Sequence, residues 1–267
     1  MKKKSVIQIL TVLLTAVLVV SGGRVAWKLL DYHRSGQSYS AAAETAGLPK
    51  RIETPQAAVS PQDKSQDDPP EPSWTEQLAA LDLPALREIN SEVLGWIAIP
   101  DTDLSYPLLQ APNNSYYLNH LWNHQRNSAG SIYLECKSAW DFSDFNTIIY
   151  GHRMRDTSMF GTLPLYKDQD FFQAHPSVYI SDEAGVRQYD IFAAYEVGVR
   201  EIVYRLDIDQ PDEIQQLIQF GLDHSVIQTG VIPGAEDHII TLSTCTERGH
   251  ATRWVVQAVL REVDGEP

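Results

Sequence analysis

The stretch that decides the fold runs from His238 to Cys245 and reads His-Ile-Ile-Thr-Leu-Ser-Thr-Cys. Its apolar and β-branched residues predict a strand that ends at the cysteine. A polar loop, Thr-Glu-Arg-Gly-His, follows, and the run Arg253–Arg261 predicts the next strand. If the two strands pair as antiparallel neighbours, Cys245 and Arg253 reach the same end of one sheet.

Short runs of the same kind recur through residues 74–263 and make this region mainly β. Most are bounded by Gly, Pro, Asn or Asp, which interrupt strands. One amphipathic helix interrupts them late, with Pro211 as its first residue, and another helix is predicted over Trp74–Ile89. A β-barrel or β-sandwich decorated with helices is therefore expected. The remaining predicted strands are Leu94–Ile99, Ser105–Leu109, Ser131–Leu134, Thr147–Tyr150, Val178–Ser181 and Arg187–Val197, and the buried stripe of the first helix is Leu78, Leu81, Leu86 and Ile89.

Composition narrows the classes of function. The chain has 267 residues, of which 43% are apolar, so it can bury a core and is not wholly disordered. Lys and Arg number 21 against 35 Asp and Glu, a formal net charge of −14. Phosphate binding depends on Lys and Arg, so this balance argues against a nucleic-acid partner. Two cysteines, Cys136 and Cys245, are too few for a disulfide scaffold or a four-cysteine zinc site, although one disulfide is possible.

The first 34 residues have the pattern of a membrane segment. Lys2–Lys4 precede an uncharged run, Ser5–Gly23, that is long enough to cross a bilayer as a helix. The lysines favour the cytoplasmic side, which predicts a single-pass signal anchor over residues 1–34 with the rest of the chain extracellular. A cleaved secretory signal peptide is the alternative, because Ser21–Gly23 has the small residues of a cleavage region.

Residues 35–73 separate this segment from the predicted domain at 74–263. They are rich in Pro, Gln, Ser and Asp and contain few large apolar residues. Such a composition cannot bury enough surface to offset its ordering entropy, so it predicts a disordered tether. Residues 264–267 are expected to form a short tail.

Three residues of the domain could form a site for thiol acyl transfer. Cys245, at a strand end, is the candidate nucleophile. His152, at the end of the strand-like run Asn146–His152, is the candidate acid or base. Arg253 carries a permanent charge and several donors, so it could favour a thiolate or stabilise an oxyanion.

Each of these assignments has an alternative. His250, five residues after Cys245, is a rival base for the same thiol. Arg253 could instead form a surface ion pair with one of the many carboxylates. Cys136 could be buried and inert, or it could pair with Cys245 and consume the nucleophile.

The motifs together resemble those of sortases. Thr241-Leu-Ser-Thr-Cys245, followed by Arg253, resembles the sortase signature Thr-Leu-x-Thr-Cys…Arg, and Asn146–His152 resembles the segment that carries the family histidine. Further stretches resemble the class B branch, and they are Leu94–Pro100, Ser105–Gln110, Asn114–His120 and Ala129–Tyr133.

This resemblance implies a mainly β fold: an eight-stranded sortase-type barrel with an N-terminal helix and a long helix inserted before the cysteine strand. It also implies a membrane-anchored cysteine transpeptidase on the outside of Gram-positive cells. Cys245 matches the nucleophile that attacks at Thr in a C-terminal sorting signal, His152 the general acid and base, and Arg253 the residue that steadies the oxyanion. An amine of peptidoglycan or of a lipid-linked cell-wall precursor then resolves the thioacyl enzyme. The resemblance implies no metal and no organic cofactor.

Substrate contacts are implied as well. The position after the cysteine is acidic in some class B members and is Thr246 here, so a contact by that acid does not carry over. The alternatives are a pilin-polymerising sortase that uses a lysine of another subunit, a thiol hydrolase, and a non-catalytic membrane-tethered binding module. The positions that match substrate contacts are Asn114, Leu118, Tyr150, Ser243 and Thr244.

Overall fold

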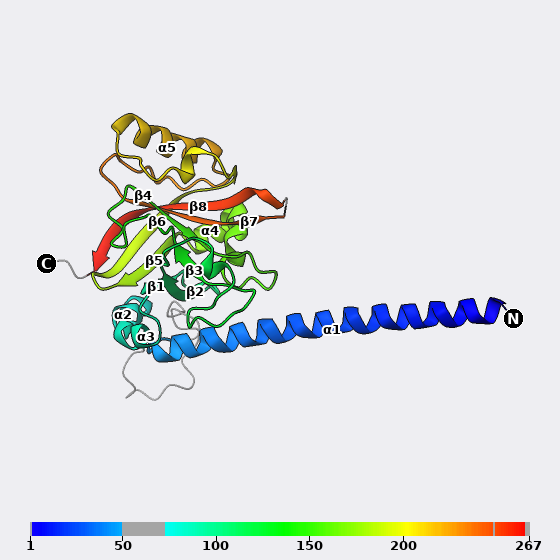
Figure 1. Ribbon diagram of the computed structural model, residues 1–267. Helices are drawn as coiled ribbons and strands as arrows, with labels where there is room; N and C mark the ends of the chain where they lie inside the picture. Colours follow the sequence, from blue (N-terminus) through cyan, green and yellow to red (C-terminus); the bar gives the residue numbers. More distant parts are fainter. Residues whose placement is uncertain (1, 50–72, 248, 265–267) are drawn as a thin grey trace, which may run out of the picture.

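A closed barrel of eight strands forms the centre of the computed structural model, which describes residues 2–49, 73–247 and 249–264 (Figure 1). Around the barrel the strands follow the order β1-β2-β3-β4-β7-β8-β6-β5. The pairs β2–β3 and β4–β7 are parallel, and the other neighbours are antiparallel. The expected eight-stranded barrel is confirmed. The strands are β1 (Val93–Ala98), β2 (Ser105–Leu109), β3 (Ile132–Leu134), β4 (Asn146–Tyr150), β5 (Ser177–Asp182), β6 (Gly185–Gly198), β7 (Ile239–Thr246) and β8 (Gly249–Asp264).

Helix α5 (Pro211–His224) is the long helix that precedes β7, and it covers the outside of the barrel beside β6 (Figure 1). It begins at Pro211 as predicted, and its apolar face buries Leu217 and Ile218. Gly221 allows the close approach, because a Cβ there would lie 2.5 Å from Oε1 of Gln257 on β8. The remaining short helices are η1 (Tyr116–Leu118), η2 (Phe160–Lys167), α4 (Gln169–Ala174) and η3 (Ile202–Tyr204).

Two short helices, α2 (Trp74–Ala79) and α3 (Leu83–Ile89), replace the single helix predicted over residues 74–89. The backbone restarts at Asp82, whose side chain accepts a hydrogen bond from the Ala85 N–H at 3.0 Å. The following proline lies in the first turn of α3, where its missing N–H costs nothing. The restart rotates the apolar stripe, so Ile89 is 49% exposed and is not buried as predicted.

Helix α1 (Lys2–Thr45) continues through the point where the tether was expected to begin. The structure therefore differs from the prediction over residues 35–49, which pack against the domain. Tyr39, Ala42, Ala46 and Leu48 are buried, and the Ala46 carbonyl accepts a hydrogen bond from the Asp82 N–H at 3.1 Å. Alanine favours helix, and its small side chain allows close packing, which explains why this segment is not a linker. The rest of the predicted tether, residues 50–72, and residues 265–267 of the tail lie outside the described residues.

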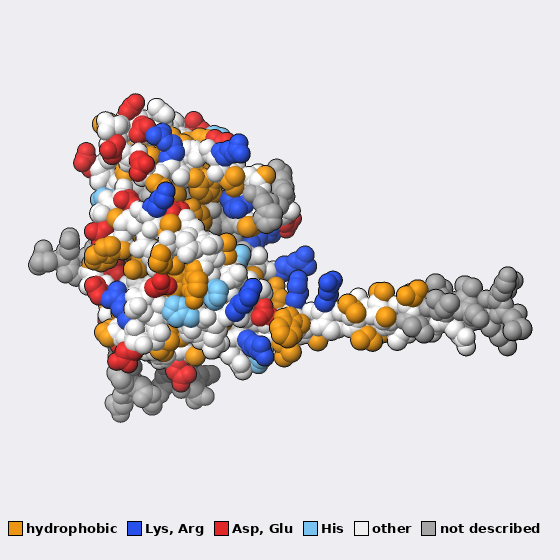
Figure 2. Space-filling model, viewed as in Figure 1, with side chains coloured by type: hydrophobic (Ala, Val, Ile, Leu, Met, Phe, Trp, Pro, Cys, Tyr) orange, Lys and Arg blue, Asp and Glu red, His pale blue; other side chains and the backbone are white. Residues whose placement is uncertain are grey.

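The N-terminal part of α1 is apolar and projects away from the barrel (Figure 1). In the described part of the chain, this helix contains one segment, beginning at Leu13, that is long and apolar enough to cross a membrane. Apolar side chains such as Leu18 and Trp27 are exposed along it (Figure 2). A signal sequence near an N-terminus has the same properties, so both alternatives from the sequence stay open.

The approach of β1 to β5 depends on Gly95. A Cβ at this position would overlap the backbone carbonyl oxygen of Ser181. We expect Gly95→Ala to lower the free energy of unfolding by about 1–3 kcal/mol, because the strands must separate to admit the methyl group. Thermal and urea unfolding of the detergent-solubilised chain would measure the change.

Gly198→Ala, at the end of β6, is a matched control. Its Cβ would meet no atom closer than Oε1 of Glu201 at 3.5 Å, an ordinary contact. Equal destabilisation by the two substitutions would contradict a specific close approach at Gly95.

Candidate active site

The parallel pairing of β4 with β7 brings His152 and Cys245 to the same end of the barrel. Tyr150 lies opposite Ser243, and the pairing extends one step further. The Gly151 N–H donates to the Ser243 carbonyl at 3.2 Å, and the Thr244 hydroxyl donates to the Gly151 carbonyl at 2.8 Å. His152 and Cys245 are the next residues on the two chains. Because parallel strands run in the same direction, both residues lie at the same end of the barrel.

Arg253 lies directly opposite Cys245 in the antiparallel pair β7–β8. Residues opposite one another in such a pair project from the same face, with Cβ atoms about 4.5–5.5 Å apart. The ladder becomes irregular immediately after this pair, where the Thr246 and Thr252 hydroxyls form a 2.6 Å hydrogen bond. The pairing therefore makes Cys245 and Arg253 direct neighbours on β7 and β8, next to the turn of the hairpin.

Two tyrosines connect this pair to the neighbouring elements. Burial raises the pKa of Tyr204, on η3, to about 12, with smaller effects from its hydrogen bond to Ser243 and from the charges of Arg253 and Cys245. Burial also raises the pKa of Tyr133, on β3, which is influenced by the charges of Glu135, Cys245 and Arg253. The charges of Arg253 and Cys245 thus both affect the pKa values of these two tyrosines.

The side chain of His152 has a defined partner. Its Nε2 lies 2.7 Å from the carbonyl oxygen of Leu118, at the end of η1. A carbonyl only accepts hydrogen bonds, so Nε2 carries a proton and Nδ1 is left to exchange one. The His152 carbonyl in turn accepts from the Phe160 N–H at 2.9 Å, which fixes the backbone on the other side of the ring.

The chain is similar to known sortases. The family described as "Sortase domain" matches residues 97–261, more than half of the chain. The chain belongs to the sortase family. Sortase B of Listeria monocytogenes is 38% identical over 183 residues, covering 67% of this chain and 74% of that protein.

Solved structures of sortase B agree with this assignment. A Bacillus anthracis sortase B in complex with AAEK1 has a TM-score of 0.69 at 28% identity and covers 88% of this chain and 99% of that one. Staphylococcus aureus sortase B, solved with a substrate and with triglycine, gives a TM-score of 0.65 at 31% identity, covering 71% of this chain and 87% of that one. The predicted resemblance to class B is confirmed, and the general activity of this sortase is that of a cysteine transpeptidase.

The structure divides the five predicted substrate contacts into two groups. Asn114, Tyr150 and Leu118 surround one side of the site, and Leu118 is 43% exposed at the end of η1. Ser243 and Thr244 are only 2% exposed. Their hydroxyls bond to the hydroxyl of Tyr204 and to the Gly151 carbonyl, each at 2.8 Å, so these side chains hold neighbouring elements together. Contact of any of the five with substrate stays a prediction.

Glu135 is a site residue that the sequence analysis missed. Its carboxylate is 6% exposed and lies between two predicted substrate contacts. Oε2 accepts from Asn114 Nδ2 at 2.6 Å and from the Tyr150 hydroxyl at 3.0 Å. Asn114 is held at its other end as well, since its Oδ1 accepts from the Cys136 N–H at 2.8 Å. The partners are 15 and 21 residues away in sequence, so only the fold brings them together.

The two cysteines are both free, and the disulfide alternative is therefore wrong. Cys136 is half-buried, and its thiol lies 3.4 Å from Oε1 of Glu135. Burial, the hydrogen bond to Glu135 and the charge of that carboxylate raise the pKa of the Cys136 thiol. This thiol is therefore kept protonated, which disfavours it as a nucleophile.

Among residues 2–49, 73–247 and 249–264, no group of three His, Cys, Asp or Glu side chains is close enough to hold a metal ion. His250 lies on β8 next to the turn, but its side chain is outside the described part of the structure.

The buried Glu135 carboxylate should support the fold of this side of the site. We expect Glu135→Ala to lower the free energy of unfolding by about 2–3 kcal/mol, because the amide of Asn114 and the hydroxyl of Tyr150 lose their acceptor. The melting temperature of the full chain in detergent would report the change.

Glu247→Ala provides the control. This glutamate pairs with Arg153 at 2.8 Å, but its side chain is 83% exposed, so its loss should barely change the melting temperature. A shift as large as that of Glu135→Ala would show that the buried network has no special role.

Proposed function

We propose that this sortase cleaves a C-terminal sorting signal of surface proteins after Thr and transfers the protein to a peptidoglycan amine. The observation that carries the proposal is the convergence of Cys245, His152 and Arg253 at one end of the barrel, through β4, β7 and β8. These are the three types of group that acyl transfer through a thioester requires. The S. aureus relative solved with a substrate and with triglycine supports a peptide donor and an amine acceptor.

In the first half of the proposed reaction, the Cys245 thiol transfers its proton to Nδ1 of His152, and its sulfur attacks the carbonyl carbon of Thr in the signal. Arg253 donates hydrogen bonds to the oxyanion of the tetrahedral intermediate. The carbon–nitrogen bond then breaks, and His152 transfers its proton to the departing amine. The products are a thioacyl enzyme on Cys245 and the released C-terminal peptide.

In the second half, an amine of peptidoglycan or of a lipid-linked precursor attacks the thioester carbonyl. His152 removes a proton from the attacking nitrogen, and the carbon–sulfur bond breaks. The Cys245 thiolate is regenerated, and a new amide joins the surface protein to the acceptor. Attack by water would yield a free acid in place of the amide, so the products distinguish a transpeptidase from a thiol hydrolase.

The other functions considered from the sequence are not favoured. A pilin-polymerising sortase would accept a lysine side chain, and a non-catalytic module would form no adduct. The backbone pairing that brings Cys245, His152 and Arg253 to one end of the barrel supports turnover over a binding role.

We also propose that α1 is an uncleaved anchor, with its N-terminus in the cytoplasm and the barrel outside the cell. The exposed apolar span of α1 supports a membrane location. Burial of Tyr39 and Ala42 against the domain supports retention of the helix, because cleavage near Gly23 would separate the anchor from this packed segment. Intact-mass analysis of the chain extracted from membranes tests this: the full length is expected, and a product that begins near residue 24 would establish a cleaved signal.

The catalytic assignment is tested with the full chain in detergent, a library of sorting-signal peptides and a cell-wall-type amine, with products read by intact mass. Cys245→Ala should abolish the adduct and lower turnover by at least about a thousandfold. Arg253→Lys should lower turnover by roughly a hundredfold, since an ammonium group cannot replace the guanidinium fork. His152→Ala should also lower turnover by roughly a hundredfold, because the departing amine of the signal peptide then lacks its proton donor.

Cys136→Ser is the matched thiol control and should leave turnover within about twofold of the wild type, because its protonated thiol takes no part. Equal losses in Cys136→Ser and Cys245→Ala would contradict the assignment of the nucleophile. A mild effect of Arg253→Lys would indicate that this arginine forms a surface ion pair and does not stabilise the oxyanion.

A further inference from the structure

The part of α1 that packs against the barrel, from Asp31 onward, forms several hydrogen bonds with one loop of the barrel and with the residues just before it. This loop, Asn127–Ser131, leads into β3. The Asn127 amide donates to the Asp31 carbonyl at 2.9 Å, and the Ser128 N–H and hydroxyl both donate to the Asp31 carboxylate, at 3.1 and 2.5 Å. Trp122, just before the loop, donates from Nε1 to the Ser38 carbonyl at 3.0 Å.

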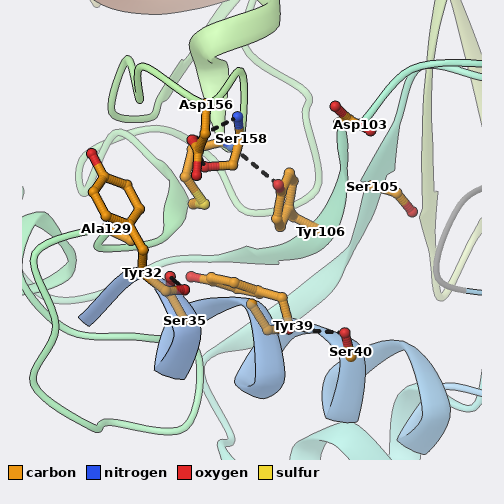
Figure 3. A pocket seen from close by; sticks show the side chains of 12 residues that line it. Tyr32, Ser35, Tyr39, Ser40, Asp103, Ser105, Tyr106, Ala129, Asp156 and Ser158 are labelled. Atoms are coloured by element: carbon orange, nitrogen blue, oxygen red, sulfur yellow. Dashed lines mark hydrogen bonds between the residues drawn. The ribbon is translucent and has the colours of Figure 1, made fainter. Parts of the chain in front are cut away.

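Tyr39 is the buried contact at the centre of this interface. Its hydroxyl donates to the Gly130 carbonyl at 2.5 Å and lies 3.1 Å from the Ser131 hydroxyl. Its ring packs edge-on against Tyr106 of β2, with ring centres 5.0 Å apart. Figure 3 shows the two rings next to each other at a cavity of about 350 Å³ between α1 and the barrel, which is lined on the barrel side by Asp156 and Ser158 among others.

The opposite side of the same loop touches the proposed catalytic histidine. Gly130 has a φ of +58°, and a Cβ there would lie 3.0 Å from Cδ2 of His152. The same Cβ would lie 2.9 Å from the Leu118 carbonyl oxygen, which is the atom that accepts the His152 Nε2 proton. The neighbouring Ser131 N–H donates to the Tyr117 carbonyl at 2.9 Å. Gly130 is therefore packed between Tyr39 on one side and the imidazole with its acceptor on the other.

We propose that Tyr39 is a positioning residue for His152, so that the juxtamembrane helix forms part of the active site. By holding the Gly130 carbonyl, the Tyr39 hydroxyl fixes the loop that supports the Leu118 carbonyl and, through it, the orientation and tautomer of the imidazole. The proposal rests on the role of His152 in the proposed function. It follows that a domain beginning after residue 49 would lack the Tyr39 hydrogen bond that helps to position His152.

The first test is Tyr39→Phe in the full chain, in detergent, at a temperature well below its melting point. The substitution removes only the hydroxyl and keeps the ring on Tyr106. We expect kcat for transpeptidation to fall about five- to tenfold, with KM for the signal peptide within about twofold, because the peptide contacts are untouched. Tyr32→Phe is the matched control: this α1 residue lines the same cavity, its hydroxyl makes no hydrogen bond to another described residue, and kcat should not change.

The second test is a double-mutant cycle with Gly130→Ala, which should lower kcat more strongly. The added methyl group would lie 2.5 Å from the Tyr117 carbonyl oxygen, 2.9 Å from that of Leu118 and 3.0 Å from Cδ2 of His152, so the loop must shift away from the imidazole and its acceptor. If Tyr39 acts through Gly130, Tyr39→Phe should have little further effect in the Gly130→Ala background. Independent, multiplying effects on kcat would overturn the proposal, as would an unchanged kcat in Tyr39→Phe alone.

A third readout does not depend on turnover. In chain labelled with ¹⁵N-histidine, the resonance of His152, assigned by its loss in His152→Gln, should report a proton on Nε2 in the wild type and a mixed tautomer in Tyr39→Phe. An unchanged tautomer would overturn the positioning role. If the wild type shows the expected tautomer and the expected change but no transpeptidation, the proposed function fails while the positioning of His152 by Tyr39 stands.

Discussion

The parallel pairing of β4 with β7 is the constraint on which the rest of the structure depends. Parallel strands need a long connection between them, and here the chain makes η2, α4, β5, β6 and α5 before it returns as β7. The barrel closes because this connection contains β5 and β6, which lie between β8 and β1. The register Tyr150 opposite Ser243 then determines that the two chains leave the sheet side by side. A slip by one residue would turn the side chains of β4 to the opposite face of the sheet and separate the imidazole from the thiol.

Buried polar groups then define the surroundings of the site. Glu135 is a carboxylate placed where water is largely excluded, and it is tolerated because an amide and a phenol donate to it. Burial is the main cause of the raised pKa of Tyr150, and the charge of Glu135 and its hydrogen bond raise it further. The same carboxylate helps to keep the Cys136 thiol protonated. One acidic residue thus orders the side of the site that holds Asn114 and keeps the neighbouring Cys136 thiol protonated.

The sequence was sufficient where a local pattern decides the structure. Short β-branched and aromatic runs located all eight strands, and Pro211 with its acidic first turn located α5. It was insufficient where a contact between distant segments decides. The Ala- and Ser-rich residues 35–49 resemble a linker until the barrel surface that buries Tyr39 is known. Glu135 looks like one surface acid among many, because Asn114 reaches it only in the folded chain.

The docked helix also relates the chemistry to the membrane. In Figure 1 the β7–β8 hairpin and the N-terminal part of α1 extend toward the same side of the molecule, whereas the end of β8 lies on the opposite side. Because α1 is one unbroken helix and is bonded to the barrel at Asp31, Ser38 and Tyr39, the barrel cannot turn freely about it. On the proposed anchoring, the end of the barrel with Cys245 therefore faces the bilayer. If the acceptor is the proposed lipid-linked amine, it is confined to that surface, and a rigid helix then holds the thiol toward it where a flexible tether would sample many orientations.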